Sequence, residues 1–412
     1  MFDFAQYAQF LNIPGVGLMF KIFKATAPLW LTAFFGYWLW NLWLVYRRTL
    51  FFAATTHVLL EIKLPKEIFK SPKAMEFLFN ALYQTGGEGN WYDIYIKGKT
   101  RPWYSLELCS IDGKLHFFIW TRKDFKNLIE ANLYSQYPGI EIYEVPDYTV
   151  PVYFDPSIHN AFAAEFELAK ADSFPIKTYS DYGMDKDPKE EYKIDPMTPL
   201  VEFLASSLGT GQNAWVQILI RAHKPENWNA DKGAYVDTRW LLGAADEVKK
   251  IRDKTKPAEG ETAAQKLTEI ELDTISAIER SVTKPGFDVG IRAIYVAPKE
   301  IFSPAVGAGI IAGFRHYNSG NLNSFKPVRN PDATVSFPWQ DRKKKKRNKL
   351  KTELLDAYKN RGYFYNEFTT PHFVLNTESL ATIFHLPSGI GTTSALERIG
   401  SRKAEAPSNL PL

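Results

Sequence analysis

The chain has 412 residues, of which 45% are hydrophobic and 23% are charged. This length and apolar content suffice for two or three domains that each bury a core, which excludes a disordered chain. The 50 Lys and Arg residues barely exceed the 46 Asp and Glu residues, so net charge alone does not indicate nucleic-acid binding. The single cysteine, Cys109, excludes an intrachain disulfide and a cysteine-based zinc site, and a reducing compartment is its simplest setting.

A hydrophobic segment near the N-terminus predicts a membrane anchor. Residues 25–46 contain no charged side chain, and a helix rising about 1.5 Å per residue would there match the roughly 30 Å hydrocarbon layer of a bilayer. Aromatic and basic residues are placed as in an interfacial belt with flanking anchors: Trp30, Trp38, Trp40, Trp43, Arg47 and Arg48. The excess of basic residues after the segment predicts a single-pass protein of the cell inner membrane with its body in the cytoplasm.

The residues before this segment predict an amphipathic helix at the membrane interface. Within residues 1–24, Phe4, Tyr7, Phe10 and Leu11 recur at helical spacing. Pro14, Gly15 and Gly17 interrupt the apolar run. A second crossing or a short re-entrant loop is the alternative interpretation.

The next segment, residues 55–148, predicts a first α+β domain. His57–Leu64 alternates as a strand, and Ser71 with Pro72 indicates the start of a helix. The turn at residues 111–114 joins two alternating segments, which predicts a β-hairpin. A helix starting at Thr121 and a strand over 140–145 complete the order βαββαβ, the ferredoxin-like pattern.

A weaker copy of this order predicts a second ferredoxin-like domain over residues 151–335. Its strands are expected at 162–171, 214–222 and 289–296, and a charge-rich segment, residues 224–284, predicts a long helical insertion. The predicted fold class is α+β, with an N-terminal transmembrane helix followed by two ferredoxin-like (βαββαβ) units, the second carrying this insertion. A polybasic and amphipathic helical segment (336–386) and an extended C-terminal tail (387–412) follow.

No motif in the sequence indicates an enzyme. The phosphate-binding pattern GxxxxGK[ST] is absent, and the glycine-rich segment Gly389–Ser394 lacks its lysine. The seven histidines show no metal-ligand spacing, and no serine lies in a GxSxG motif. We therefore predict a non-catalytic protein without a cofactor or metal, with an enzyme of unrecognised mechanism as the alternative.

One cluster of basic residues predicts an anion-binding surface. Eight positive charges occur within ten residues, just before an amphipathic stretch: Arg342, Lys343, Lys344, Lys345, Lys346, Arg347, Lys349 and Lys351. Anionic lipid and nucleic acid are both compatible partners. A solvated charge run without a ligand is the third alternative.

Several stretches resemble the region that precedes the motor domain in membrane-associated type IV secretion and conjugation ATPases of the HerA/FtsK-like superfamily. They are Leu59, Glu61 and Ile62 with Pro65, and the runs 195–200, 212–220 and 375–385. The resemblance implies a membrane-anchored scaffold or docking component of such a machine, working with a separately encoded P-loop ATPase. The alternative function is a membrane-tethered protein that binds anionic lipid or nucleic acid independently of any motor, and a homo-oligomer is compatible with either.

The C-terminal region supplies the predicted docking surface for that ATPase. Its apolar side chains are expected to form an exposed patch: Leu375, Leu380, Ile383, Phe384 and Leu386. The alternative is that these residues form the last strand and helix of the second domain.

Overall fold

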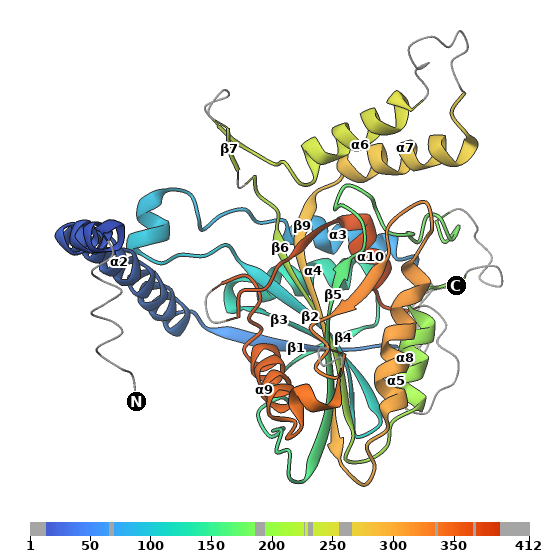
Figure 1. The fold of residues 1–412 in the computed structure, drawn as a ribbon. Coiled ribbons are helices and arrows are strands. Elements are labelled where there is room, and N and C mark those ends of the chain that lie inside the picture. Colours follow the sequence, from blue (N-terminus) through green and yellow to red (C-terminus); the bar gives the residue numbers. More distant parts are fainter. Residues whose placement is uncertain are drawn as a thin grey trace, which may run out of the picture. The chain divides into compact units, whose positions relative to one another are not determined.

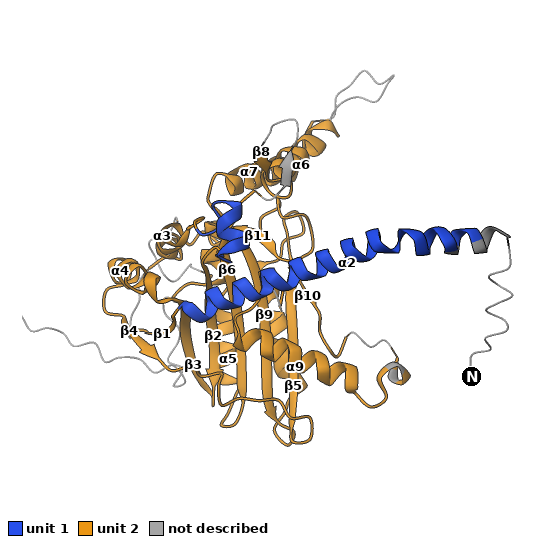
Figure 2. Cartoon of the chain, turned by 90° about the vertical axis from the view of Figure 1, so that its left-hand side faces the viewer, with its two compact units in different colours: residues 1–55, 87–100 blue, residues 56–86, 101–412 orange. Residues whose placement is uncertain are grey.

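The structure is a computed structural model that describes residues 14–65, 70–185, 194–225, 227–229, 234–254, 266–333, 337–365 and 368–387. The chain divides into two compact units, Met1–Thr55 with Gly87–Thr100, and Thr56–Gly86 with Arg101–Leu412 (Figure 2). Most of the predicted interfacial segment and nearly all of the predicted tail, residues 1–13 and 388–412, lie outside the described residues.

The first unit contains one long helix, α2 (Pro14–Ala54), and a short π-helical segment, η1 (Tyr92–Ile96). The indole Nε1 of Trp43 donates a hydrogen bond of 2.9 Å to the carbonyl oxygen of Tyr95. The Arg47 guanidinium donates to the carbonyl oxygen of Ile96. These contacts hold η1 against the C-terminal part of α2.

The prediction of a transmembrane helix over residues 25–46 is wrong. In the described part of the chain, no helix contains a stretch long and apolar enough to cross a membrane. Thr26, Pro28, Thr32, Tyr37 and Asn41 make the uncharged run less apolar than a membrane span requires. The predicted inner-membrane localisation rested on this helix and is wrong as well. The residues proposed as its anchors all lie in α2: Trp30, Trp38, Trp40, Trp43, Arg47 and Arg48.

The second unit is built on a nine-stranded antiparallel sheet (Figure 1). Its order is β10-β5-β9-β6-β2-β3-β1-β4, with β11 paired to β9. The strands are β1 (His57–Lys63), β2 (Trp103–Ile111), β3 (Lys114–Arg122), β4 (Glu141–Val145), β5 (His159–Leu168), β6 (Asn213–Ala222), β9 (Gly286–Pro298), β10 (Phe325–Val328) and β11 (Phe373–Asn376).

Two halves of this sheet have equivalent strand orders, β4-β1-β3-β2 and β10-β5-β9-β6, which is the order of a ferredoxin-like unit. An antiparallel β2–β6 pair, from Trp103↔Arg221 to Ile111↔Asn213, joins the halves. Each of these two strands thereby forms hydrogen bonds with the backbone groups that would otherwise be unpaired at the edge of the other half. The predicted fold class is therefore corrected to a mixed α+β body with one large sheet and no transmembrane helix.

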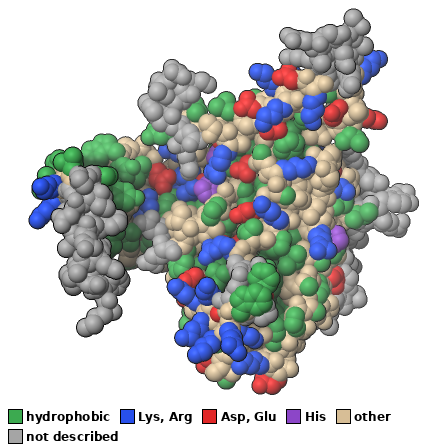
Figure 3. Space-filling model, in the orientation of Figure 1, with side chains coloured by type: hydrophobic (Ala, Val, Ile, Leu, Met, Phe, Trp, Pro, Cys, Tyr) green, Lys and Arg blue, Asp and Glu red, His purple; other side chains and the backbone are tan. Residues whose placement is uncertain are grey.

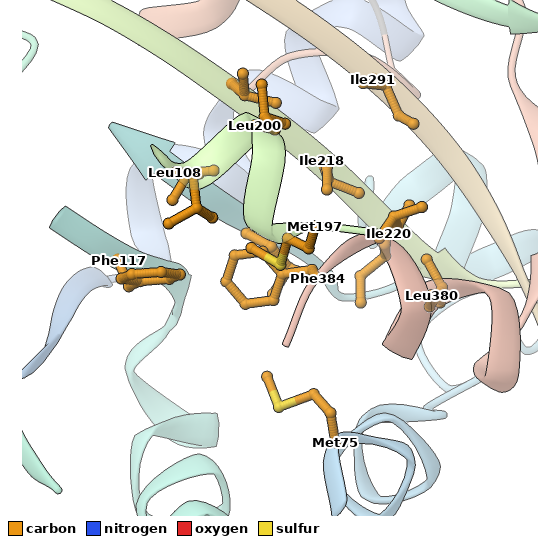
Figure 4. Close-up of a cluster of buried hydrophobic side chains, with 14 of the residues drawn as sticks. Met75, Leu108, Phe117, Met197, Leu200, Ile218, Ile220, Ile291, Leu380 and Phe384 are labelled. Atoms are coloured by element: carbon orange, nitrogen blue, oxygen red, sulfur yellow. The ribbon is translucent and has the colours of Figure 1, made fainter. Parts of the chain in front are cut away.

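Helices cover one face of the sheet and enclose the main core. They are α3 (Lys73–Leu82), α4 (Lys126–Gln136), α5 (Thr198–Ser206), α8 (Pro304–Phe314) and α10 (Thr377–Ile383). Side chains from both halves meet in this core, as Figure 4 shows for Leu108, Phe117, Ile218 and Phe384. The two halves therefore share a hydrophobic core as well as a sheet.

The opposite face of the sheet is covered by α9 (Lys345–Lys359), whose Leu354, Leu355 and Tyr358 pack against Trp215 and Ile294. Between β6 and β9 lie a short hairpin, β7 (Asn227–Asn229) with β8 (Ala234–Val236), and the helices α6 (Leu241–Asp253) and α7 (Glu269–Val282). The segment over which the sequence predicts a helical insertion therefore contains two helices and a two-stranded hairpin.

Candidate functional site

Five consecutive basic residues form an exposed surface at the start of α9. Arg342, Lys343, Lys344, Lys345 and Lys346 are all exposed, and we call them the basic surface. Lys and Arg side chains gather in this region in the lower part of Figure 3. Within the described residues, none of the five forms an ion pair. Their charges are therefore available to an anionic partner.

The other three predicted basic residues have acidic neighbours. The Arg347 Nε lies 4.0 Å from Asp341, and the Lys349 Nζ lies 3.7 Å from Glu353. Lys351 is buried, with its Nζ 3.4 Å from Asp332. The structure thus divides the predicted cluster into five freely exposed charges and three paired ones.

Asp341 fixes the start of α9. It ends a 3₁₀ turn, η5 (Pro338–Asp341), and its carboxylate accepts hydrogen bonds from the backbone N–H groups of Lys346 (3.1 Å) and Arg347 (2.9 Å). Burial alone would raise the pKa of Asp341, but these backbone donors lower it. Basic residues at a helix N-terminus oppose the helix dipole. Helix stability therefore does not account for the basic surface.

Two exposed aromatic rings precede the basic surface in the sequence, with Gln340 and Asp341 between them and Arg342. Phe337 is 50% exposed and Trp339 is 72% exposed. Their rings are stacked, with centroids 4.7 Å apart and planes 9° from parallel. We call them the aromatic pair. The pair was not predicted, although two aromatic residues flanking Pro338 shortly before a run of basic residues were a usable signal.

A buried arginine attaches the C-terminal end of α9 to the sheet. Arg361 follows the helix with a left-handed backbone (φ 48°). Its Nε donates to Glu107 Oε1 on β2 (3.1 Å), and its Nη2 donates to Asp147 Oδ1 (3.0 Å). Burial alone would lower the pKa of Arg361, but these carboxylates hold it well above its usual value. The position of α9 therefore depends on this cluster.

A row of buried polar side chains continues this attachment across the sheet. Glu107, Gln217, Arg292 and Glu165 lie in register on β2, β6, β9 and β5. Gln217 donates to Glu107 (3.1 Å), and Arg292 donates to Gln217 (3.2 Å) and Glu165 (2.8 Å). Gln217 also donates to the carbonyl oxygen of Tyr358 in α9 (3.1 Å). The junction of the two halves is thus the place where α9 is attached.

The predicted docking patch is not exposed. All five of its residues are at most 3% exposed and belong to the main core: Leu375, Leu380, Ile383, Phe384 and Leu386. Leu375 lies in β11, which pairs with β9, and α10 packs beside α3 (Figure 4 shows Leu380 and Phe384). The prediction of an exposed apolar patch is wrong because the β11–β9 pairing and the packing of α10 against α3 bury these residues.

A second charged cluster lies where the insertion between β6 and β9 leaves the sheet. His223 follows β6, and its Nδ1 is 2.5 Å from Asp288 on β9 while its Nε2 is 3.1 Å from Asp237. Asp237 also accepts the backbone N–H of Leu241 (2.9 Å) at the start of α6. Within the described residues, no group of three or more His, Cys, Asp or Glu side chains is arranged to hold a metal.

This cluster predicts a pH-dependent stability. Burial alone would lower the pKa of His223, but the two carboxylates raise it from 6.5 to about 9. Because the folded pKa exceeds the unfolded one, the stabilisation is complete below about pH 6.5 and is lost as the pH rises to about 9, up to about 3 kcal/mol in all. Urea titrations across this range should show the loss in the wild type and in His316→Gln, an exposed control. His223→Gln should flatten the profile, and an unchanged slope would contradict the assignment.

The fold and the basic surface define an α+β protein with one large antiparallel sheet and an exposed cationic segment at the start of α9. Residues 52–395 match the model of a family described as a domain of unknown function, DUF8128. Since the match covers most of the sequence, the chain belongs to this family. No curated protein matches it.

The family match carries no statement of function and gives no support to the predicted role in secretion or conjugation. The resemblance to the pre-motor region of the ATPases, and the partnership with a P-loop ATPase that it implies, stay predictions.

Proposed function

We propose that this protein is a non-catalytic binding protein for single-stranded nucleic acid, and that the basic surface and the aromatic pair contact the strand. The observation that carries the proposal is their adjacency. Five exposed charges without acidic partners in the described chain follow a stacked and exposed pair of rings after only two residues, Gln340 and Asp341. Proteins that bind single strands combine these two elements, a cationic track for phosphates and aromatic faces for bases.

The aromatic pair favours nucleic acid over an anionic lipid surface. The two rings already lie nearly parallel, at 9°, so an unpaired base extends the same stack. Both lipid and nucleic acid are attracted to the lysines, and attraction to charge alone does not separate them. A nucleobase contacts the surface by stacking on these rings, and a lipid headgroup does not.

The test is a titration of a fluorescent single strand of about 20 nucleotides at several salt concentrations. Neutralisation of five phosphates predicts a slope of log K against log salt of about −3.5. Duplex DNA of the same sequence and vesicles with anionic lipid are tested in parallel. Absence of strand binding near 50 mM salt, or binding to the vesicles alone, would refute the proposal.

A further inference from the structure

A pocket of 540 Å³ lies beside the basic surface, between α8, β5 and the N-terminal part of α9. This volume is within the range of small-molecule sites, about 300–1,000 Å³. Lys344 belongs both to the basic surface and to the pocket wall. The pocket is therefore continuous with the surface proposed to bind a strand.

One side of this pocket is apolar and rigidly held. Phe162 and Phe302 line it, together with Ala308 and Ile311 of α8. The Phe162 ring lies against Gly307, where an added Cβ would come within 2.5 Å of it. Glycine at this position leaves room for the ring to approach the helix closely. The result is an aromatic wall suited to the face of a planar ligand.

The opposite side carries an excess of positive charge. Lys344, Arg347 and Lys351 line it, and Asp332 is the acidic residue among the lining side chains. The Lys351 Nζ lies 3.3 Å from Asn160 Oδ1, and its side chain is 6% exposed. Burial lowers the pKa of Lys351, Asp332 opposes this shift, and the charges of Lys344 and Arg347 lower the pKa further. A bound anion relieves this repulsion.

Side-chain amides complete the polar wall. Asn160, Asn330 and Asn348 line the pocket. Amide groups both donate and accept hydrogen bonds, which matches the edge of a nucleobase. The pocket thus offers a flat apolar wall, amides and cations within one cavity.

We propose that this pocket receives one unpaired nucleotide of a bound single strand, with its base against Phe162 and Phe302 and its phosphate between Lys344 and Arg347. This inference rests on the proposed function and deepens it. A base in a duplex is stacked and paired, so it enters such a pocket only at the cost of leaving the helix. The pocket therefore makes the protein select single strands.

The test fills the pocket without changing charge. Ala308 is exposed on α8 and lines the pocket, whereas Ala312 is exposed one turn later and does not. Ala308→Leu should weaken binding of the labelled strand about tenfold, the effect of losing one stacked base, and should leave the salt slope unchanged. Ala312→Leu should bind as the wild type does. Thermal unfolding of both variants checks that they fold.

A second pair of variants tests the polar side. Asn348→Glu places a carboxylate in the pocket, and Thr352→Glu makes the same charge change on an exposed position of α9. Asn348→Glu should weaken strand binding at least tenfold more than Thr352→Glu. Equal affinities within both pairs would overturn the pocket while leaving the proposed function intact. A wild type that binds no strand would overturn both.

Discussion

Replacing Arg361 with methionine should lower the free energy of unfolding by about 3–5 kcal/mol, because it leaves the buried carboxylate of Glu107 without its cation. Glu107 is fully buried and accepts from the Arg361 Nε at 3.1 Å. A methionine fills a similar volume but donates no hydrogen bond. The loss should appear in urea unfolding curves of the full chain.

Arg342→Met is the matched control for this change, because Arg342 is an exposed arginine in the turn before α9. Surface substitutions of this kind usually alter stability by about 0.5 kcal/mol or less. If Arg361→Met were no more destabilising than Arg342→Met, the attachment of α9 through Arg361 would be wrong.

Replacing all five residues of the basic surface with glutamine should reduce the affinity for a single strand about three-thousandfold at 0.1 M salt. Each phosphate contact contributes about 0.7 to the salt slope, so five contacts account for about 3.5 logarithmic units at that concentration. Stability should not fall, since these charges lie at a helix N-terminus, where positive charge is unfavourable. The measurements are fluorescence anisotropy and thermal unfolding.

The control removes the same number of positive charges elsewhere in the second unit. Five exposed basic residues on or beside the insertion helices are replaced with glutamine: Lys249, Lys250, Arg252, Lys254 and Lys266. This variant should keep most of the affinity and the wild-type salt slope. An equal loss in both variants would mean that net charge, and not the basic surface, determines binding.

Local chemistry in the sequence predicted several elements well. The β2–β3 hairpin is confirmed, with Ile111 opposite Lys114. Asp112 (φ 51°) and Gly113 (φ 81°) occupy the left-handed conformations that a tight two-residue turn requires. Likewise, α3 begins at Lys73, directly after Ser71 and Pro72, where serine followed by proline indicated a helix start. Such signals depend on neighbouring residues alone.

Features that depend on distant residues were not predictable in this way. The β2–β6 pairing and the burial of the segment containing Leu375 both arise from partners far away in the sequence. Arg361 reads in the sequence as an ordinary surface residue, and its burial depends on Glu107, 254 positions earlier. The uncharged run before Arg47 suggested a membrane span because charge was weighed more heavily than the polar residues within the run.

Only part of the candidate site could be predicted, because the rest of it also depends on residues that are distant in the sequence. The run of lysines is evident in the sequence, but which of them are free of acidic partners depends on Asp332, Asp341 and Glu353. The pocket brings Phe162 on β5 next to Lys344, and this proximity exists only in the folded chain.

Photo-crosslinking tests the central claim most directly, because it identifies the residues that touch the strand. A single strand carrying photoreactive bases is irradiated with the full-length protein, and the crosslinked peptides are identified by mass spectrometry. We predict that the major crosslinks fall on residues 337–351, with Trp339 prominent because its exposed ring stacks on a base. Crosslinks confined to other parts of the chain, with this segment unmodified, would contradict the account.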